Sequence, residues 1–169
     1  MTETAVAAPI AGGRHDFDFL FGTWRIHNRK LVDPLAEPPN DWIEFEAWSE
    51  ARPILSGLGN VDTYGAPDFP GRPGFEALTL RLFEPETGLW RIWWASTVGH
   101  GQLDTPVVGR FGDGRGVFEC DDVLGGRDVR VRYEWLDMTA ASARWRQSFS
   151  FDAGKAWHTN WLMDLSRSE

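Results

Sequence analysis

The chain has 169 residues, of which 42% are hydrophobic and 25% charged, as expected for one globular domain. Its net charge of −8 repels phosphate backbones and anionic lipid surfaces, so we expect neither nucleic acid nor a membrane as a partner. Cys120 is the only cysteine, which excludes an intramolecular disulfide and favours a cytoplasmic location.

The N-terminal segment differs in composition from the rest. Residues 1–13 are mainly Ala, Gly, Thr and Pro without periodicity, which predicts a disordered tail before a single domain over residues 14–169. The tail has neither the basic start nor the apolar run of a signal peptide. The next segment, His15–Phe21, holds three Phe and one Leu, which predicts a short helical turn that plugs a core.

From Gly22 onward, short β-rich runs alternate with Gly, Pro, Asp and Asn, which predicts an all-β domain. Turn sequences such as Gly112-Asp113-Gly114 indicate antiparallel hairpins, and no segment between them has a helical period. The predicted strands span residues 22–31, 42–52, 58–64, 76–83, 89–97, 106–111, 115–122, 128–136, 142–150 and 157–166.

The last hairpin indicates how these strands are arranged. A regular turn at residues 152–155 pairs Phe149 with His158, Gln147 with Asn160 and Trp145 with Leu162. One face then carries aromatic, amide and imidazole groups together, which suits a barrel with a cavity better than a tightly packed sandwich. We therefore predict a single antiparallel up-and-down β-barrel of about ten strands.

Phe19-Leu20-Phe21-Gly22-Thr23-Trp24 is an aromatic turn followed by Gly-x-Trp. It resembles the entrance of lipocalin-like barrels, in which the Trp closes the floor and an Arg of a late strand stacks over it. With Gly57–Asp62, Thr79–Phe83, Pro106–Phe111, Ser142–Trp145 and Thr159–Trp161, the chain resembles bacterial lipocalin-like (calycin-like) proteins of the DUF1579 type over about residues 15–167. The resemblance implies Arg144 as the stacking Arg, with Arg167 as a second candidate, and implies no common activity.

The histidines do not favour a metal site. His15, His27, His100 and His158 lack the i, i+2 or i, i+4 spacing of a local zinc site, so we expect no metal. A resemblance to nitrobindin-like barrels, in which a late-strand histidine holds haem iron, implies His158 as the one candidate ligand. Because the glycine-rich opening of those barrels is missing, we expect no cofactor and keep haem binding through His158 as a minor alternative.

Several carboxylates are candidates for acid–base chemistry: Glu44, Glu46, Asp62, Asp121, Asp122 and Asp164. By strand parity Glu44 and Glu46 share a face with Trp42 and Trp48, and a carboxylate among aromatic rings has a raised pKa. The alternative, which we favour, turns Phe45 inward and both glutamates to solvent.

Strand parity leaves the arginines and some tryptophans open. Arg81, Arg110, Arg130 and Arg132 either line the lumen or pair with acids on the outer wall. Trp90, Trp93 and Trp94 put rings on both faces of one strand, and the outer rings need cover from a second copy, the N-terminal segment or a loop; the first alternative is a homodimer.

The combined features predict a barrel that binds a small apolar or aromatic molecule in its lumen. The predicted lining residues are Trp24, Trp48, Trp94, Trp145, Gln147, His158 and Asn160. The alternative is a cofactor-free enzyme of the cyclase or isomerase type in bacterial secondary metabolism, with Glu46 and His158 as candidate catalytic residues.

Overall fold

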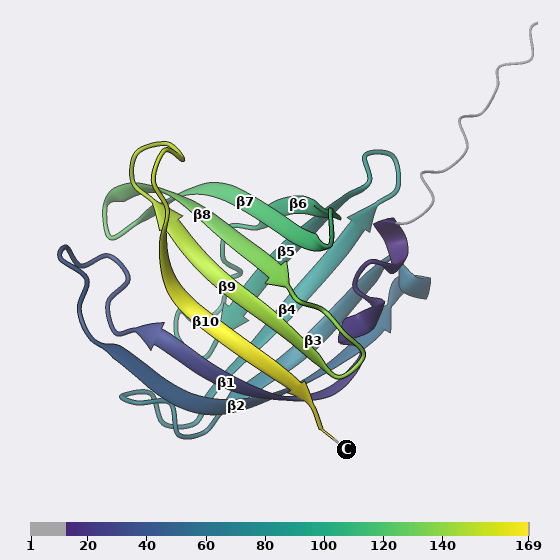
Figure 1. The fold of residues 1–169 in the computed structure, drawn as a ribbon, viewed down its shortest axis with the longest axis horizontal. Coiled ribbons are helices and arrows are strands. Elements are labelled where there is room, and N and C mark those ends of the chain that lie inside the picture. The colour runs from purple at the N-terminus through teal and green to yellow at the C-terminus, as the bar shows by residue number, and fades with distance from the viewer. Residues whose placement is uncertain (1–12, 169) are drawn as a thin grey trace, which may run out of the picture.

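A computed structural model describes residues 13–168, which form a closed antiparallel barrel of ten strands (Figure 1). Each strand pairs with its neighbours in sequence, and β1 pairs with β10 to close the ring. The predicted fold class is confirmed, and each strand boundary lies within two residues of its predicted position. The strands are β1 (Gly22–Leu31), β2 (Trp42–Ile54), β3 (Gly59–Ala66), β4 (Phe75–Glu84), β5 (Leu89–Ser96), β6 (Val107–Gly112), β7 (Arg115–Leu124), β8 (Arg127–Leu136), β9 (Ser142–Ser150) and β10 (His158–Arg167).

Two short 3₁₀ turns, η1 (Gly13–His15) and η2 (Asp18–Leu20), close one end of the barrel. Between them Phe17 is fully buried, with its ring edge-on to Trp90 and Phe111 at centroid distances of 4.9 Å. This is the plug that the aromatic segment predicted. The predicted tail lies largely outside the described residues, and its last residue, Gly13, belongs to η1.

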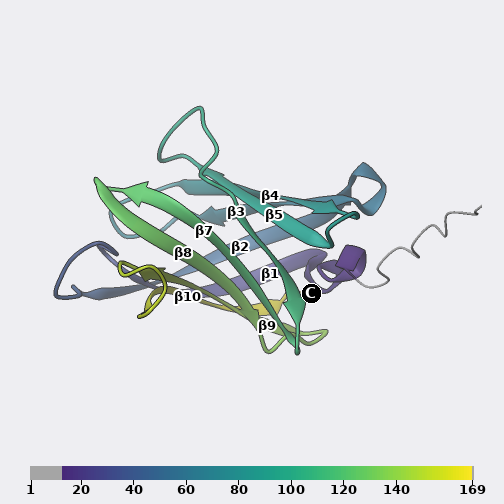
Figure 2. The ribbon, with the colours of Figure 1, turned by 90° about the horizontal axis from the view of Figure 1, so that it is seen from above.

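Because successive strands run in opposite directions, the loops that follow odd-numbered strands gather at the end of the barrel away from the N-terminal turns (Figure 2). We call this the open end; its loops are residues 32–41, 67–74, 97–106, 125–126 and 151–157. The second of these loops folds inward: Phe69 is buried and packs on Phe45 and Phe75 at centroid distances of 4.2 and 5.0 Å.

Strand β2 places its aromatic residues on both faces. Phe45 and Ala47 point inward and are buried, whereas Glu46 lies on the outer face beside His27 and Trp48 is 47% exposed. The favoured alternative for this strand, with Phe45 inward and the glutamates at the surface, is therefore correct, and Trp48 was wrongly placed in the lumen. The Trp48 ring is accommodated outside because it covers Gly65 of β3, where any Cβ would collide with it.

The floor of the barrel is held by Trp24 and Arg167. The buried Trp24 ring donates from Nε1 to the Leu20 carbonyl at 2.8 Å, and the Arg167 guanidinium stacks 4.2 Å from the ring centroid. Arg167 also donates to the carbonyls of Phe19 and Phe21, both at 2.6 Å. The strand register explains the stacking, since Trp24 and Arg167 are direct partners in the β1–β10 pair.

The sequence resemblance had favoured Arg144 for this position, and that assignment is wrong. Arg144 is 63% exposed and pairs with Asp164 on the outer face at 2.9 Å. It lies on β9, one strand further from β1, with its side chain on the solvent side of the sheet.

Replacing Arg167 by Ala should therefore destabilise the barrel by about 1–3 kcal/mol, because the Trp24 stacking and the hydrogen bonds to the N-terminal turn are lost together. The matched change Arg144→Ala removes an exposed ion pair and should cost less than about 1 kcal/mol. Urea unfolding followed by tryptophan fluorescence measures both. Equal losses would contradict the assignment of the floor to Arg167.

Candidate functional site

A cavity of about 420 Å³ lies in the half of the barrel nearer the open end. Aromatic and apolar side chains form about half of its exposed wall, and polar groups from β1, the β5–β6 loop, β7 and β9 form the rest. The lining residues are Lys30, Trp94, Gln102, Leu103, Asp104, Thr105, Val107, Cys120, Asp122, Leu124, Val131, Tyr133, Trp145, Gln147, Phe149 and Trp161.

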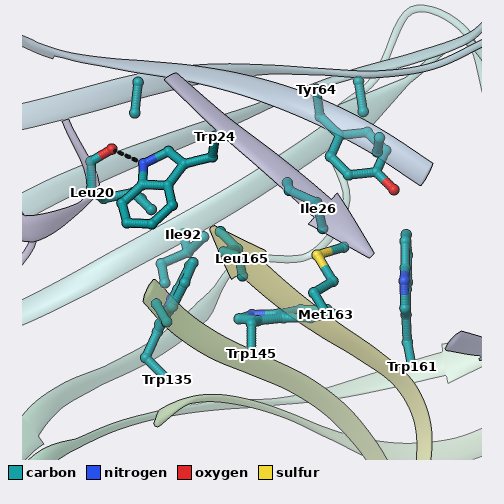
Figure 3. Packing of buried hydrophobic residues seen from close by; sticks show 14 of the residues in the cluster. Leu20, Trp24, Ile26, Tyr64, Ile92, Trp135, Trp145, Trp161, Met163 and Leu165 are labelled. Carbon is teal, nitrogen blue, oxygen red and sulfur yellow. Dashed lines mark hydrogen bonds between the residues drawn. The ribbon is translucent and has the colours of Figure 1, made fainter. Parts of the chain in front are cut away.

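Trp161 is the centre of the aromatic wall. Its ring stands nearly perpendicular to that of Trp145, at 5.7 Å and 88°, as Figure 3 shows, and to that of Trp94, at 5.9 Å and 83°. Trp145 in turn meets Tyr133 at 5.0 Å. Such edge-to-face contacts fix the ring planes and present flat surfaces to the cavity.

A β-bulge in β10 brings Trp161 to this wall. The predicted pair of Phe149 with His158 is correct, but the pairing shifts by one residue between Thr159 and Trp161. Gln147 is therefore paired with Trp161, and the two predicted pairs beyond the bulge are wrong. The buried Asn160 at the bulge still accepts a hydrogen bond from Gln147 Nε2 at 2.8 Å.

Asn28, a residue that the sequence analysis did not single out, fixes the orientation of two of these rings. Its side-chain oxygen accepts from the Tyr64 hydroxyl at 2.8 Å and from Trp161 Nε1 at 3.0 Å. Its amide nitrogen donates to the carbonyls of Ile26 and Phe45, both at 3.3 Å. Every polar group in this cluster thus has a partner, as burial requires.

Lys30, also missed, is the one basic residue that lines the cavity among residues 13–168. Its side chain is 8% exposed, and Nζ donates only to the Leu31 carbonyl, at 3.3 Å, and lies 5.2 Å from the centroid of the Trp161 ring. Burial, with a smaller contribution from Arg72 and against an opposing one from Asp33, lowers the pKa of this ammonium from 10.5 to about 8. The inward position of Lys30 could have been predicted from the sequence, because strand parity places it on the same face of β1 as Trp24.

The wall formed by β7 and the β5–β6 loop carries acidic groups instead. Asp104 and Asp122 line the cavity there, and burial, with Asp122 adding, raises the pKa of Asp104. Burial also raises the pKa of the Cys120 thiol to about 11, with contributions from Asp122 and Asp121. Cys120 is therefore a neutral thiol at physiological pH and a poor nucleophile.

A smaller chamber of about 50 Å³ lies beneath this cavity and shares Trp94, Tyr133 and Trp145 with it. It contains a buried ion pair between Arg81 and Asp62 at 2.6 Å. Arg81 Nη1 also donates to Asn60 at 3.0 Å, whereas its Nε has no partner among residues 13–168. Of the arginines whose orientation was left open, Arg81 faces the interior.

The other arginines of that group lie on the outer surface. Arg130 pairs with Asp121 at 2.9 Å and Arg132 with Glu119 at 2.7 Å, while Arg110 is exposed. The charges of Arg130 and Arg132 are thus balanced by acids on β7, the second of the two alternatives that strand parity left open, whereas Arg110 has no ion pair among residues 13–168.

The predicted ligand-binding residues separate into three groups. Trp94, Trp145 and Gln147 line the cavity, and Asn160 is buried behind Gln147. Trp24 lies below in the floor, and Trp48 is on the outer face. His158 is exposed at the rim, with its ring 6.3 Å from that of Phe151.

Neither candidate catalytic residue reaches the cavity. Glu46 lies outside the barrel, and His158 is not part of the cavity wall. Within residues 13–168, no three His, Cys, Asp or Glu side chains come together in a metal-binding group. The same residues include no helix with the length and apolar character needed to cross a bilayer.

The lowered pKa of Lys30 predicts a pH-dependent stability. Between about pH 8 and pH 10.5 the unfolded chain keeps a proton on Lys30 that the folded chain has released, so the free energy of unfolding rises with pH. The rise amounts to about 3 kcal/mol in total. Lys30→Met removes the buried charge, so it should be more stable than the wild type at pH 7 and should lack the rise.

Urea unfolding of both proteins at pH 7 and pH 10 provides the comparison. The difference in free energy of unfolding between Lys30→Met and the wild type should be smaller at pH 10 than at pH 7. Parallel profiles for the two proteins would show that Lys30 titrates as it does in the unfolded chain.

No protein-family model and no curated protein matches this chain. Among solved structures it is similar to the S-type phycobiliprotein lyase CPES from Guillardia theta, with a TM-score of 0.58 and 10% sequence identity. The alignment covers 96% of this chain and 94% of that chain. At this identity the likeness shows the fold alone, which is a lipocalin-like barrel.

Proposed function

We propose that the barrel binds a small, flat, mostly apolar molecule in the cavity near its open end. The observation that carries the proposal is the cavity of about 420 Å³ walled by the rings of Trp94, Trp145 and Trp161. Binding sites for small molecules fall in this size range and combine aromatic walls with a few placed polar groups. A barrel of ordinary stability has no need of such a space, since unfilled volume in a core is destabilising.

The polar groups of the wall indicate the character of the ligand. Gln147, Lys30, Asp104 and Asp122 offer a neutral amide, an ammonium and two carboxyl groups to a cavity that is also lined by aromatic rings. Lys30 lies on β1 and Asp122 on β7, four strands apart in the order of the barrel. A ligand with an aromatic body and polar groups at its ends matches this distribution better than a plain hydrocarbon.

The two alternatives have less support. The enzyme hypothesis loses its named residues, because Glu46 and His158 do not line the cavity. Haem does not fit either, because His158 is exposed at the rim and no histidine within residues 13–168 lies on the cavity wall. The structural neighbour's name, phycobiliprotein lyase, describes that protein and, at 10% identity, assigns no ligand to this one.

We also propose that the chain is a bacterial barrel of the DUF1579 type. The segments that support this are the Gly22–Trp24 entrance, Pro106–Phe111 and Thr159–Trp161. In the structure they form the floor, strand β6 with its preceding residue, and the bulge of the cavity wall.

The first experiment is native mass spectrometry and an absorption spectrum of the freshly purified protein, followed by titration with N-phenyl-1-naphthylamine, a flat uncharged fluorophore. We expect saturable fluorescence enhancement with one site per chain. The native mass also reports any co-purified molecule and whether the chain is the homodimer that its outer tryptophans suggest.

Variants locate the site. Trp94→Ala should weaken binding of the fluorophore about tenfold, because the ring forms part of the wall and stacking on it is worth about 1–1.5 kcal/mol. Val131→Phe, which fills the cavity from β8 without removing a ring, should weaken binding as well.

The matched control is Trp48→Ala, which removes an equal ring from the outer face and should leave the affinity unchanged. Thermal unfolding confirms that each variant is folded. Equal effects of the Trp94 and Trp48 changes, or a folded Val131→Phe protein that binds as well as the wild type, would refute binding in the cavity.

A further inference from the structure

The chain has only two lysines, and they lie in opposite environments. Lys155 is exposed in the β9–β10 loop, whereas Lys30 is buried on the wall of the cavity. The remaining 15 of the 17 basic residues are arginines, which cannot act as amine nucleophiles. Any amine chemistry of the side chains therefore belongs to these two positions, and only one of them faces the cavity.

The surroundings of Lys30 leave its nitrogen available. No carboxylate of residues 13–168 lies within 4.0 Å of Nζ, and its single hydrogen bond, to the Leu31 carbonyl, is long at 3.3 Å. The charged groups that act on it are Arg72 from the β3–β4 loop and Asp33 from the β1–β2 loop. Its partner across the β1–β10 pair is Trp161, whose ring is held by Asn28.

We propose that Lys30 captures a carbonyl group of the ligand as a reversible imine, so that the cavity takes aldehydes or ketones attached to a flat apolar body. The proposal rests on the proposed function and names a chemical class of ligand for the same cavity. A desolvated lysine in an apolar pocket is the arrangement that makes an amine nucleophilic near neutral pH. Burial acts in this direction here, since it lowers the pKa of Lys30 to about 8.

The step balances without any oxidant or reductant. The neutral amine nitrogen adds to the carbonyl carbon, and the carbonyl π electrons pass to oxygen. The nitrogen then loses its two protons as the oxygen leaves with them as water, and a carbon–nitrogen double bond remains. Hydrolysis reverses the step and releases the ligand unchanged, so the chemistry is capture rather than consumption.

The experiment uses 2-naphthaldehyde as the probe, with sodium cyanoborohydride to reduce any imine to a stable amine. The folded full-length protein is treated at pH 7 with limiting aldehyde, and peptide mapping by mass spectrometry compares Lys30 with Lys155 in the same molecules. We expect Lys30 to be modified at least about tenfold faster, because the aldehyde's aromatic body binds in the cavity beside it. The preference should disappear in urea.

Two variants complete the test. Lys30→Met should lose the cavity adduct while remaining folded, which thermal unfolding checks. Lys155→Arg should keep the adduct at Lys30. Modification confined to Lys155 and the terminal amine would overturn the proposal. If the fluorophore binds in the cavity in that case, the binding function stands and only the imine is refuted; if it does not bind, both fail.

Discussion

Pairing of β1 with β10 is the interaction on which the rest of the molecule depends. It turns a ten-stranded meander into a closed wall, and a closed wall is what allows an interior to hold a cavity. The same pairing sets Trp24 opposite Arg167 at one end of the two strands and Lys30 opposite Trp161 at the other. The floor and the basic side of the cavity are thus two ends of one strand pair.

This arrangement divides the interior into parts with different tasks. Near the floor, Phe17 and Trp24 are packed tightly by the N-terminal turns and give stability. Toward the open end the tryptophan rings stand edge to face around unfilled space, so they are rigid without filling it. Between them, Nη1 of the buried Arg81 is shared between Asp62 and Asn60, while its Nε has no partner among residues 13–168.

The strands were predictable because Gly, Pro and Asp mark almost every turn, and an up-and-down order follows when no connection is long enough for a crossover. The faces of β2 were harder to predict, since Trp48 and Phe45 are both aromatic and only one can face inward. What decides between them is Gly65 on a neighbouring strand, a relation that strand periodicity within β2 does not contain. The choice between Arg167 and Arg144 for the floor likewise depends on the strand register, which pairs Arg167 with Trp24 and Arg144 with Asp164, and not on residue type.

The bulge at Asn160 sets the phase of the last strand. Before it, His158, exposed at the rim, shares the face of its partner Phe149, which lines the cavity; after it, Trp161, Met163 and Leu165 face inward, so the positions on that face change from even to odd numbers. If Asn160 instead paired regularly with Gln147 and the bulge were absent, the faces of the remaining strand would be exchanged, turning Asp164 inward and Trp161 outward. Arg167 would leave Trp24 in the same movement. The orientation of Trp161 in the cavity wall and that of Arg167 over Trp24 in the floor therefore depend on each other, because the same β-bulge sets the strand register at both positions.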